Sequence, residues 1–258
     1  MVQSVKCTWG VVVALAAAGV LHGTVVGLPE AEFLRRYPMA SNGHVYIHNL
    51  YGDVRIMVWD REQVQVQAIR KSKDTRRADD ARVLVDSSYE SFTISTQYAA
   101  SGLDRPSSVE YRITVPRNAN LEHVKLINGG LFITGVVGTV HASSVNGDIQ
   151  AEGLEGETEI STINGRLTAD FARLGAETPI SLSSVNGPIR LTIPAGSGPN
   201  IEARNLSGGI DSDVGRSWRA AGGHRMQVGG RAGGAQIRVH NVNGGIRIRS
   251  NPVTRSWS

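Results

Sequence analysis

The residues best suited to chemistry in this sequence are five acids that fall within twelve positions: Asp148, Glu152, Glu155, Glu157 and Glu159. On a strand, Glu157 and Glu159 would share one face and stand about 6.6 Å apart. Paired carboxylates can bind a cation, or can act as the acid and base of a carbohydrate-active lyase or hydrolase. The cluster contains no Lys or Arg base and no aromatic ring for sugar stacking. A solvated acidic face is therefore favoured, and a weak cation site and a catalytic pair are the alternatives.

Other signals of catalysis are weak. His44 and His48 have a spacing that can chelate zinc on a helix, but "HVYIH" alternates like a strand, where the two rings lie about 13 Å apart. The sequence has no Gly-x-Ser-x-Gly nucleophile motif and no glycine-rich phosphate motif. Cys7 is the only cysteine. We therefore predict no catalytic residue, no metal site and no cofactor, and a protein that is not an enzyme.

The charge of the chain is unevenly divided. Residues 28–213 carry 18 Lys and Arg against 23 Asp and Glu, whereas residues 214–258 carry eight Arg and no acid. A solvated basic face is the simple interpretation, and docking onto lipid headgroups, an acidic polysaccharide or the acidic body of another copy is the alternative. Nucleic acid is not expected, because no set of stacking aromatics is interspersed with these arginines. The candidate contacts with an anionic surface are Arg216, Arg219, Arg225, Arg231, Arg238, Arg247 and Arg249.

The N-terminal segment resembles an export signal. Lys6 precedes an uncharged apolar run of 13 residues, Trp9 to Leu21, which is shorter than the roughly 20 residues of a membrane span. We predict that residues 1–27 are a signal peptide, with an uncleaved membrane anchor as the alternative. The protein would then be periplasmic, displayed on the cell surface or secreted.

A repeated Asn-Gly pair is the strongest pattern in the sequence. Successive glycines of the repeat are 18, 18, 22, 21 and 36 residues apart, which indicates structural units of similar length. In one unit Ser207 stands where Asn is expected, and this corner should loosen one rung of a ladder. The predicted corner residues are Asn128, Gly129, Asn146, Gly147, Asn164, Gly165, Asn186, Gly187, Gly208, Asn243 and Gly244.

Short segments of alternating apolar and polar residues follow each corner, as in half-buried strands. In an antiparallel meander, each Asn-Gly would be a type I′ hairpin turn. In a solenoid, each unit would be one coil, with Asn side chains stacked in a hydrogen-bonded ladder and Ile, Val and Leu filling the interior. The solenoid is favoured, because only stacking explains why Ser/Thr-Val/Ile recurs before Asn-Gly. The predicted fold is all-β, a right-handed parallel β-helix-like solenoid with short coils.

The 258 residues suit one large domain or two small ones. Residues 33–120 are predicted to be a strand-rich region that caps the first coil, because an open coil end would expose unpaired backbone groups. The solenoid repeats would occupy residues 121–250, interrupted by a Gly/Arg-rich loop at 216–234. Residues 251–258 would form a C-terminal tail.

The order of these motifs resembles the bacterial "putative adhesin" family of β-strand-repeat domains of unknown function. The resemblance rests on "NLYGDVRI", "IRLTIPAGSGPNIEARNLSGGIDSD" and "GGAQIRVHNVNGGIRI", and it covers residues 44–250. It implies a β-helix-like solenoid on an exported bacterial protein, and it supplies no catalytic residues. We expect a non-catalytic binding, adhesin-like or scaffolding module of the cell envelope, whose partner is an envelope polysaccharide, an anionic lipid surface or another protein. The alternative is a carbohydrate-active enzyme that uses the acidic cluster at 148–159.

Overall fold

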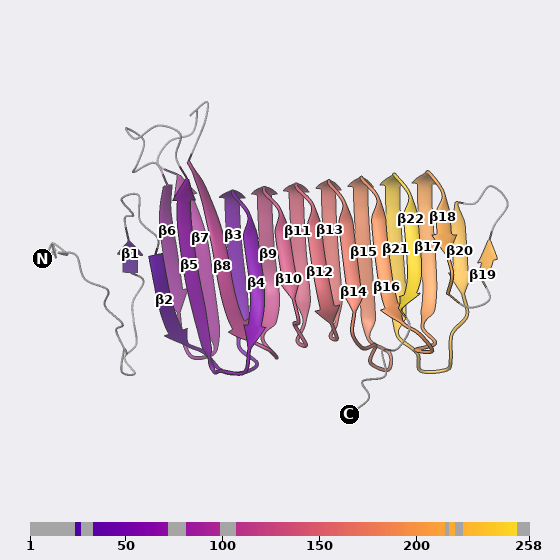
Figure 1. The fold of residues 1–258 in the computed structure, drawn as a ribbon, viewed down its shortest axis with the longest axis horizontal. Helices are drawn as coiled ribbons and strands as arrows, with labels where there is room; N and C mark the ends of the chain where they lie inside the picture. The colour runs from indigo at the N-terminus through magenta and orange to yellow at the C-terminus, as the bar shows by residue number, and fades with distance from the viewer. Residues whose placement is uncertain are drawn as a thin grey trace, which may run out of the picture.

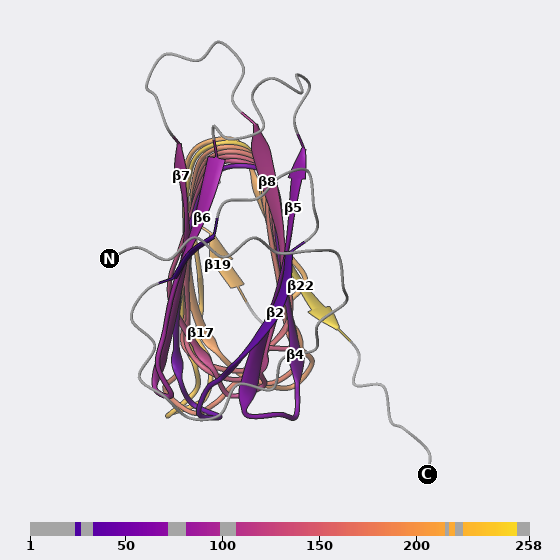
Figure 2. The same cartoon turned by 90° about the vertical axis from the view of Figure 1, so that its left-hand side faces the viewer.

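The structure, a computed structural model, describes residues 24–26, 33–71, 81–98, 107–214, 217–219 and 224–251. This part of the chain is all-β and forms two large mixed sheets that face each other in an elongated stack (Figures 1 and 2). No helix with the length and apolar content of a membrane span occurs in these ranges. The all-β prediction is confirmed. The predicted signal peptide lies outside the described residues, apart from Thr24–Val26.

The first sheet has 12 strands and the second has 10. The first sheet contains β1 (Thr24–Val26), β3 (His44–Tyr51), β6 (Ala81–Ser87), β7 (Ser91–Tyr98), β9 (Asn120–Asn128), β11 (Val140–Asn146), β13 (Thr158–Asn164), β15 (Pro179–Asn186), β17 (Asn200–Ser207), β19 (Ser217–Arg219), β20 (Arg225–Val228) and β21 (Gln236–Asn243). The second contains β2 (Phe33–Pro38), β4 (Val54–Trp59), β5 (Gln63–Lys71), β8 (Ser108–Pro116), β10 (Leu131–Thr134), β12 (Ile149–Leu154), β14 (Leu167–Phe171), β16 (Ile189–Pro194), β18 (Ile210–Ser212) and β22 (Ile246–Asn251).

The repeated unit is a strand of the first sheet, a corner, and a strand of the second sheet. Equivalent strands of neighbouring units pair in parallel, so that β11 lies between β9 and β13 while β12 lies between β10 and β14. Each corner therefore joins strands of different sheets, and Asn-Gly is not the turn of a hairpin. The units are β3–β4, β9–β10, β11–β12, β13–β14, β15–β16, β17–β18 and β21–β22.

The order of the units in space differs from their order in the sequence. The last unit, β21–β22, lies between β15–β16 and β17–β18, and pairs in parallel with both (Figure 1). The unit with the degenerate corner, β17–β18, is consequently at the end of the stack. The corner that is expected to loosen one rung therefore lies at an end of the stack.

Antiparallel strands flank the stack at both ends. At the N-terminal end, β7 and β8 pair in parallel with β3 and β4, and on their other sides they pair antiparallel with β6 and β5. The region 33–120 thus also contributes β3–β4, which is itself a complete unit.

At the other end, the stretch 216–234 is not only a loop. It contains β19 and β20, and β20 pairs antiparallel with β17. Alternation explains the strand, because Met226 and Val228 point into the core while Arg225 and Gln227 are exposed.

The core lies between the two sheets and consists mainly of aliphatic side chains stacked in register. Strand alternation directs every second side chain inward, and equivalent positions of successive units meet in rows. One buried row of the first sheet is Ile47, Val124, Ala142, Ile160, Leu182, Val239 and Ala203. Facing rows of the second sheet include Ile133, Ala151, Ala169, Leu191 and Ile248.

Candidate binding surface

The corner glycines allow the units to stack closely. Gly129, Gly147, Gly165, Gly187, Gly208 and Gly244 have φ values between 120° and 155°. A Cβ atom at any of these positions would lie 1.9 to 2.5 Å from the carbonyl oxygen of the neighbouring corner glycine. A side chain therefore cannot be accommodated unless the units move apart.

Asparagine side chains form a ladder along the corners. The Nδ2 group of Asn146 donates to Oδ1 of Asn128 (3.0 Å), and Asn164 donates to Asn146 (2.8 Å). Asn186 donates to Asn164 (3.0 Å), and Asn243 donates to Asn186 (2.9 Å). The ladder therefore crosses five consecutive units without a gap.

The two ends of the ladder are the units that lack Asn at this position. Tyr51 is in register with Asn128, and Ser207 is in register with Asn243. A missing amide at either end of the ladder loses one hydrogen bond instead of two, because only one adjacent unit carries an in-register Asn.

The position two residues before each ladder position faces inward, and in five of the seven units a polar side chain there donates to a corner carbonyl. Leu126 occupies it on β9, and Ser144 on β11 has no hydrogen-bond partner among the described residues. Asn241 donates to the carbonyl of Gly187 (3.1 Å), and Asn205 donates to that of Gly244 (2.7 Å). These contacts leave few backbone groups of the corners without partners. The buried polar residues at this position are Asn49, Ser144, Thr162, Ser184, Asn205 and Asn241.

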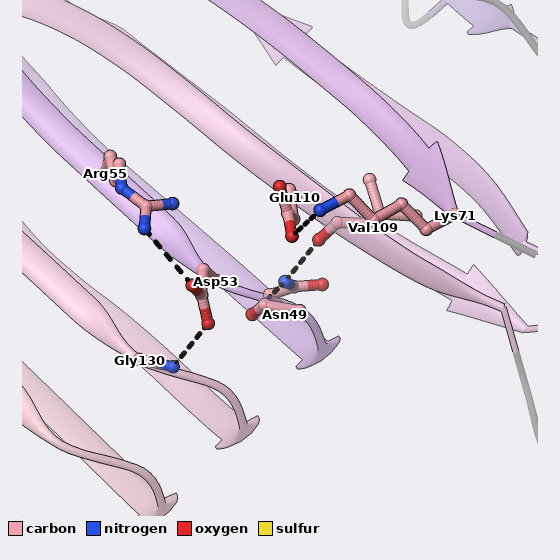
Figure 3. Close-up of polar contacts among 8 residues, drawn as sticks. Asn49, Asp53, Arg55, Lys71, Val109, Glu110 and Gly130 are labelled. Atoms are coloured by element: carbon pink, nitrogen blue, oxygen red, sulfur yellow. Dashed lines mark hydrogen bonds and ion pairs between the residues drawn. The ribbon is translucent and has the colours of Figure 1, made fainter.

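The corner of β3–β4 shows these contacts in detail (Figure 3). Asn49 donates to the carbonyl of Val109 (2.9 Å), which ties the unit to β8. Asp53 accepts a hydrogen bond from the backbone N–H of Gly130 (2.9 Å) and lies 3.4 Å from Arg55. The polar groups at the corner therefore bind other parts of the fold.

The acidic cluster of the sequence is not one site in the structure. Glu152 lies on β12 in the second sheet, whereas Glu159 lies on β13 in the first sheet. Asp148 is at the corner between β11 and β12, where its Oδ1 accepts a hydrogen bond from the backbone N–H of Arg166 (2.7 Å). Within the described ranges, no group of three or more His, Cys, Asp or Glu residues is arranged to hold a metal ion.

Besides Asp148, which lies 3.9 Å from Arg166, three of these acids have side-chain partners. Glu152 accepts from Gln150 (2.6 Å), Glu155 pairs with Arg173 (3.7 Å), and Glu157 lies 3.8 Å from His141. The first two contacts are on or beside the second sheet, and the third is on the first. This arrangement is that of solvated, locally paired carboxylates.

The candidate arginines of the basic end are also divided. Arg225 and Arg238 are exposed on the first sheet, while Arg247 and Arg249 are on the second, where both approach Asp211. Arg231 is exposed after β20. Arg216 lies outside the described residues, and the Arg219 side chain is not described.

A shallow hollow is lined by Arg190, Asp211 and Arg247 on the second sheet. Gly209 and Gly245 also line it, and they leave space where four other units carry Asp, Arg or Pro after the corner glycine. Arg247 is 4.0 Å from Asp211, so the basic charge in the hollow is partly neutralised.

An exposed row of aliphatic side chains was not anticipated from the sequence. The residue immediately before each ladder position points outward from the first sheet, because the buried residue before it points inward. The pairing registers align these residues across seven strands. We call them the aliphatic row: Leu50, Ile127, Val145, Ile163, Val185, Val242 and Leu206.

The fold and its surface define a class of all-β protein that presents in-register rows of side chains along two facing sheets. Among solved structures, the chain is similar to a "putative cell adhesion protein" from Clostridium sporogenes, with a TM-score of 0.54, 11% identity, and coverage of 86% of this chain and 99% of that one. The resemblance to adhesin-like strand-repeat proteins is thereby confirmed for the fold.

Two further likenesses have TM-scores below 0.5. One is to a "putative adhesin" from Bacteroides fragilis (TM-score 0.44, 11% identity, 86% of this chain and 98% of that one). The other is to a "putative lipid binding protein" from Parabacteroides distasonis (TM-score 0.31, 11% identity, 85% of this chain and 96% of that one). No family model and no curated protein matches the sequence.

Proposed function

We propose that this protein is a non-catalytic binding or scaffolding module of the bacterial cell envelope, similar in role to an adhesin. The observation that carries the proposal is the arrangement of its functional groups. The amides, hydroxyls and aliphatic side chains of the repeat form straight rows over several units, and the acids that could have formed a catalytic pair are spread over two sheets. Such a surface suits an extended partner better than a small substrate.

We also propose that the fold is a right-handed β-solenoid. The strand–corner–strand units would be the coils of a right-handed β-solenoid, in keeping with the strong right-handed preference of connections between parallel strands. Strands β2 and β5 to β8, which end the stack in antiparallel pairs, would cap its first coil. Capping of this kind protects the open backbone edge of a parallel stack.

Export is also part of the proposal. Its support is the N-terminal segment, with a positive charge followed by a 13-residue apolar run. The absence of cysteine after Cys7 suits an oxidising compartment. The similarity of the fold to a protein described as a cell adhesion protein points in the same direction.

A binding screen with parallel turnover assays tests the proposal. The full chain is incubated with arrays of envelope polysaccharides, with lipids and with envelope proteins, at low and high salt. Saturable binding without product is the expected result. Glycan cleavage that is lost in Glu157→Gln or Glu159→Gln would overturn the proposal in favour of a carbohydrate-active enzyme.

A further inference from the structure

Exposed apolar side chains are concentrated on one line of the surface. Nine large hydrophobic residues are exposed in the described ranges, and six of them belong to the aliphatic row. Leu206 at the C-terminal end is 74% exposed, and the other five are 36 to 44% exposed. The row spans seven strands, a length of about 29 Å at the usual strand spacing. Exposed apolar residues in a continuous line mark a contact surface more often than scattered ones do.

The neighbouring row on the same face carries basic and neutral residues but no acid. It lies two residues earlier on each strand, and three serines occupy its centre. Basic side chains occupy both of its ends. We call this set the basic row: His48, Lys125, Ser143, Ser161, Ser183, His240, Arg204 and Arg225.

The positive charge on this face is highest near Leu206, at the C-terminal end of the aliphatic row. Arg204, Arg225 and Arg238 surround one carboxylate, that of Glu202. A hydrogen bond from Arg204, together with the charges of all three arginines, holds the pKa of Glu202 below its usual value. One acid cannot neutralise three guanidinium groups, so this end of the face keeps a net positive charge beside Leu206.

The combination of the two rows selects the partner. A free phosphate or carboxylate would satisfy an arginine but would cover none of the aliphatic row. A second copy could also pack on this face about a two-fold axis. The three arginines of one copy would then face either the same arginines or Lys125 of the other copy, and these like charges repel. A bilayer with anionic lipids offers negative headgroups above an apolar layer, which matches both rows.

We propose that the aliphatic row and the basic row dock the protein onto the surface of a bilayer that contains anionic lipids. The inference rests on the proposed function as a binding module, and it names the partner and the contact face. Apolar side chains of the row enter the headgroup boundary, and the arginines at the C-terminal end contact phosphates. The second sheet faces away from the membrane.

A fluorescent probe tests which face makes contact. In a Cys7→Ser background, an environment-sensitive dye is attached at Val185→Cys in the aliphatic row or at Met57→Cys on the second sheet, two positions that are both exposed. Vesicles of phosphatidylcholine with an equal part of phosphatidylglycerol should shift the emission of the first dye to the blue and leave the second unchanged. The N-terminal segment is the same in both proteins, so it cannot cause a difference between them.

Substitutions test the two contributions. Arg204→Gln with Arg225→Gln should weaken vesicle binding by about 25-fold, because each basic residue near an anionic surface contributes about a fivefold factor. Ile163→Thr with Leu206→Thr should weaken it by about tenfold while keeping strand-compatible side chains. Arg112→Gln with Arg190→Gln on the second sheet is the matched control and should bind like the unsubstituted chain.

Several outcomes would overturn the inference. These are equal emission shifts at both dye positions, no shift at Val185→Cys, equal binding to pure phosphatidylcholine vesicles, or a dimer that buries the Val185→Cys dye without lipid. An equal loss of vesicle binding in the control variant and in the row variants would also overturn the inference. If the dye shows no lipid contact but the screen finds a glycan or protein ligand, only this inference fails and the proposed function stands.

Discussion

The closeness of the stacked corners gives a prediction that can be worked from the structure. Gly165 has a φ of 151°, and an added Cβ would lie 2.2 Å from the carbonyl oxygen and 2.6 Å from the carbonyl carbon of Gly147. Both atoms belong to the backbone of the neighbouring unit. Hydrogen bonds from Gly147 to the carbonyl of Asn164 (2.9 Å) and from Gly165 to that of Asn186 (3.0 Å) fix this spacing.

The substitution Gly165→Ala should therefore be strongly destabilising. The positive φ costs about 1 to 2 kcal/mol for a residue with a Cβ. Forcing an atom into a packed contact costs about 1 to 3 kcal/mol more, because the units must separate. The expected loss in the free energy of unfolding is about 2 to 5 kcal/mol, a large fraction of the stability of an ordinary domain.

Equilibrium denaturation followed by circular dichroism measures the loss, with two glycines as controls. Gly196 has a φ of 75°, and an added Cβ there would have no atom within 4 Å, so Gly196→Ala should lose only the conformational part, about 1 kcal/mol. Gly209 also has open space and no positive φ, so Gly209→Ala should be nearly neutral. If Gly165→Ala is no more destabilising than Gly196→Ala, the close approach of the corners is refuted.

Three further predictions concern the ladder and two titratable side chains. Asn164→Ala removes two ladder hydrogen bonds, so it should lower the free energy of unfolding by about 1 to 2 kcal/mol in denaturation experiments. Asn243→Ala removes one and should cost about half as much. Equal losses would contradict a continuous ladder. Burial, followed by the nearby charge of Glu152, raises the pKa of Asp170. The folded state therefore loses stability as the pH rises through that pKa. Asp170→Asn should raise the Tm at pH 7, and this gain should vanish below the ordinary aspartate pKa of 3.8. Burial, followed by the positive charges of Lys125 and His123, lowers the pKa of His48. The charge of His48 should therefore strengthen binding to anionic vesicles only when the pH falls below the ordinary histidine value of about 6.5. His48→Gln should remove this part of the pH dependence.

The local chemistry of the repeat was readable from the sequence. Period-2 alternation placed strands on both sides of each corner, and Asn-Gly marked the positions where the chain turns with positive φ at glycine. Stacked asparagines predicted a ladder, and the hydrogen bonds among Asn128, Asn146, Asn164, Asn186 and Asn243 confirm it. These features depend on residues close together in the chain or on identical residues at equivalent positions, which a sequence displays directly.

The direction of the aliphatic row was only partly readable. Ile160 and Ile163 lie three apart on β13, so alternation requires them to face opposite ways, and Ile160 is buried while Ile163 is exposed. The sequence does not indicate which of two apolar positions is inside when both faces carry one. The second sheet decides, because its side chains fill the space on one face of β13 only.

The acidic cluster was dispersed for a related reason. Positions close in sequence, such as Glu152 and Glu159, fall on opposite sheets, since each unit turns from one sheet to the other within about eighteen residues. Proximity in the chain is then a poor guide to proximity in space. The registers between units are the better guide, as the alignment of Ser143, Ser161 and Ser183 shows.

By itself, the sequence determined the unit, its corners and its all-β character, because these follow from backbone preferences and alternation within one repeat. Only the tertiary structure decided the order of the units and hence which corner ends the ladder. Parallel in-register stacking requires that like residues meet, and any two units meet that requirement. Long-range packing therefore fixes the position of β21–β22 inside the stack. β22 pairs with β16 over six residues. The shorter β18, with Ser207 at its corner, occupies the end, where it needs only one parallel neighbour.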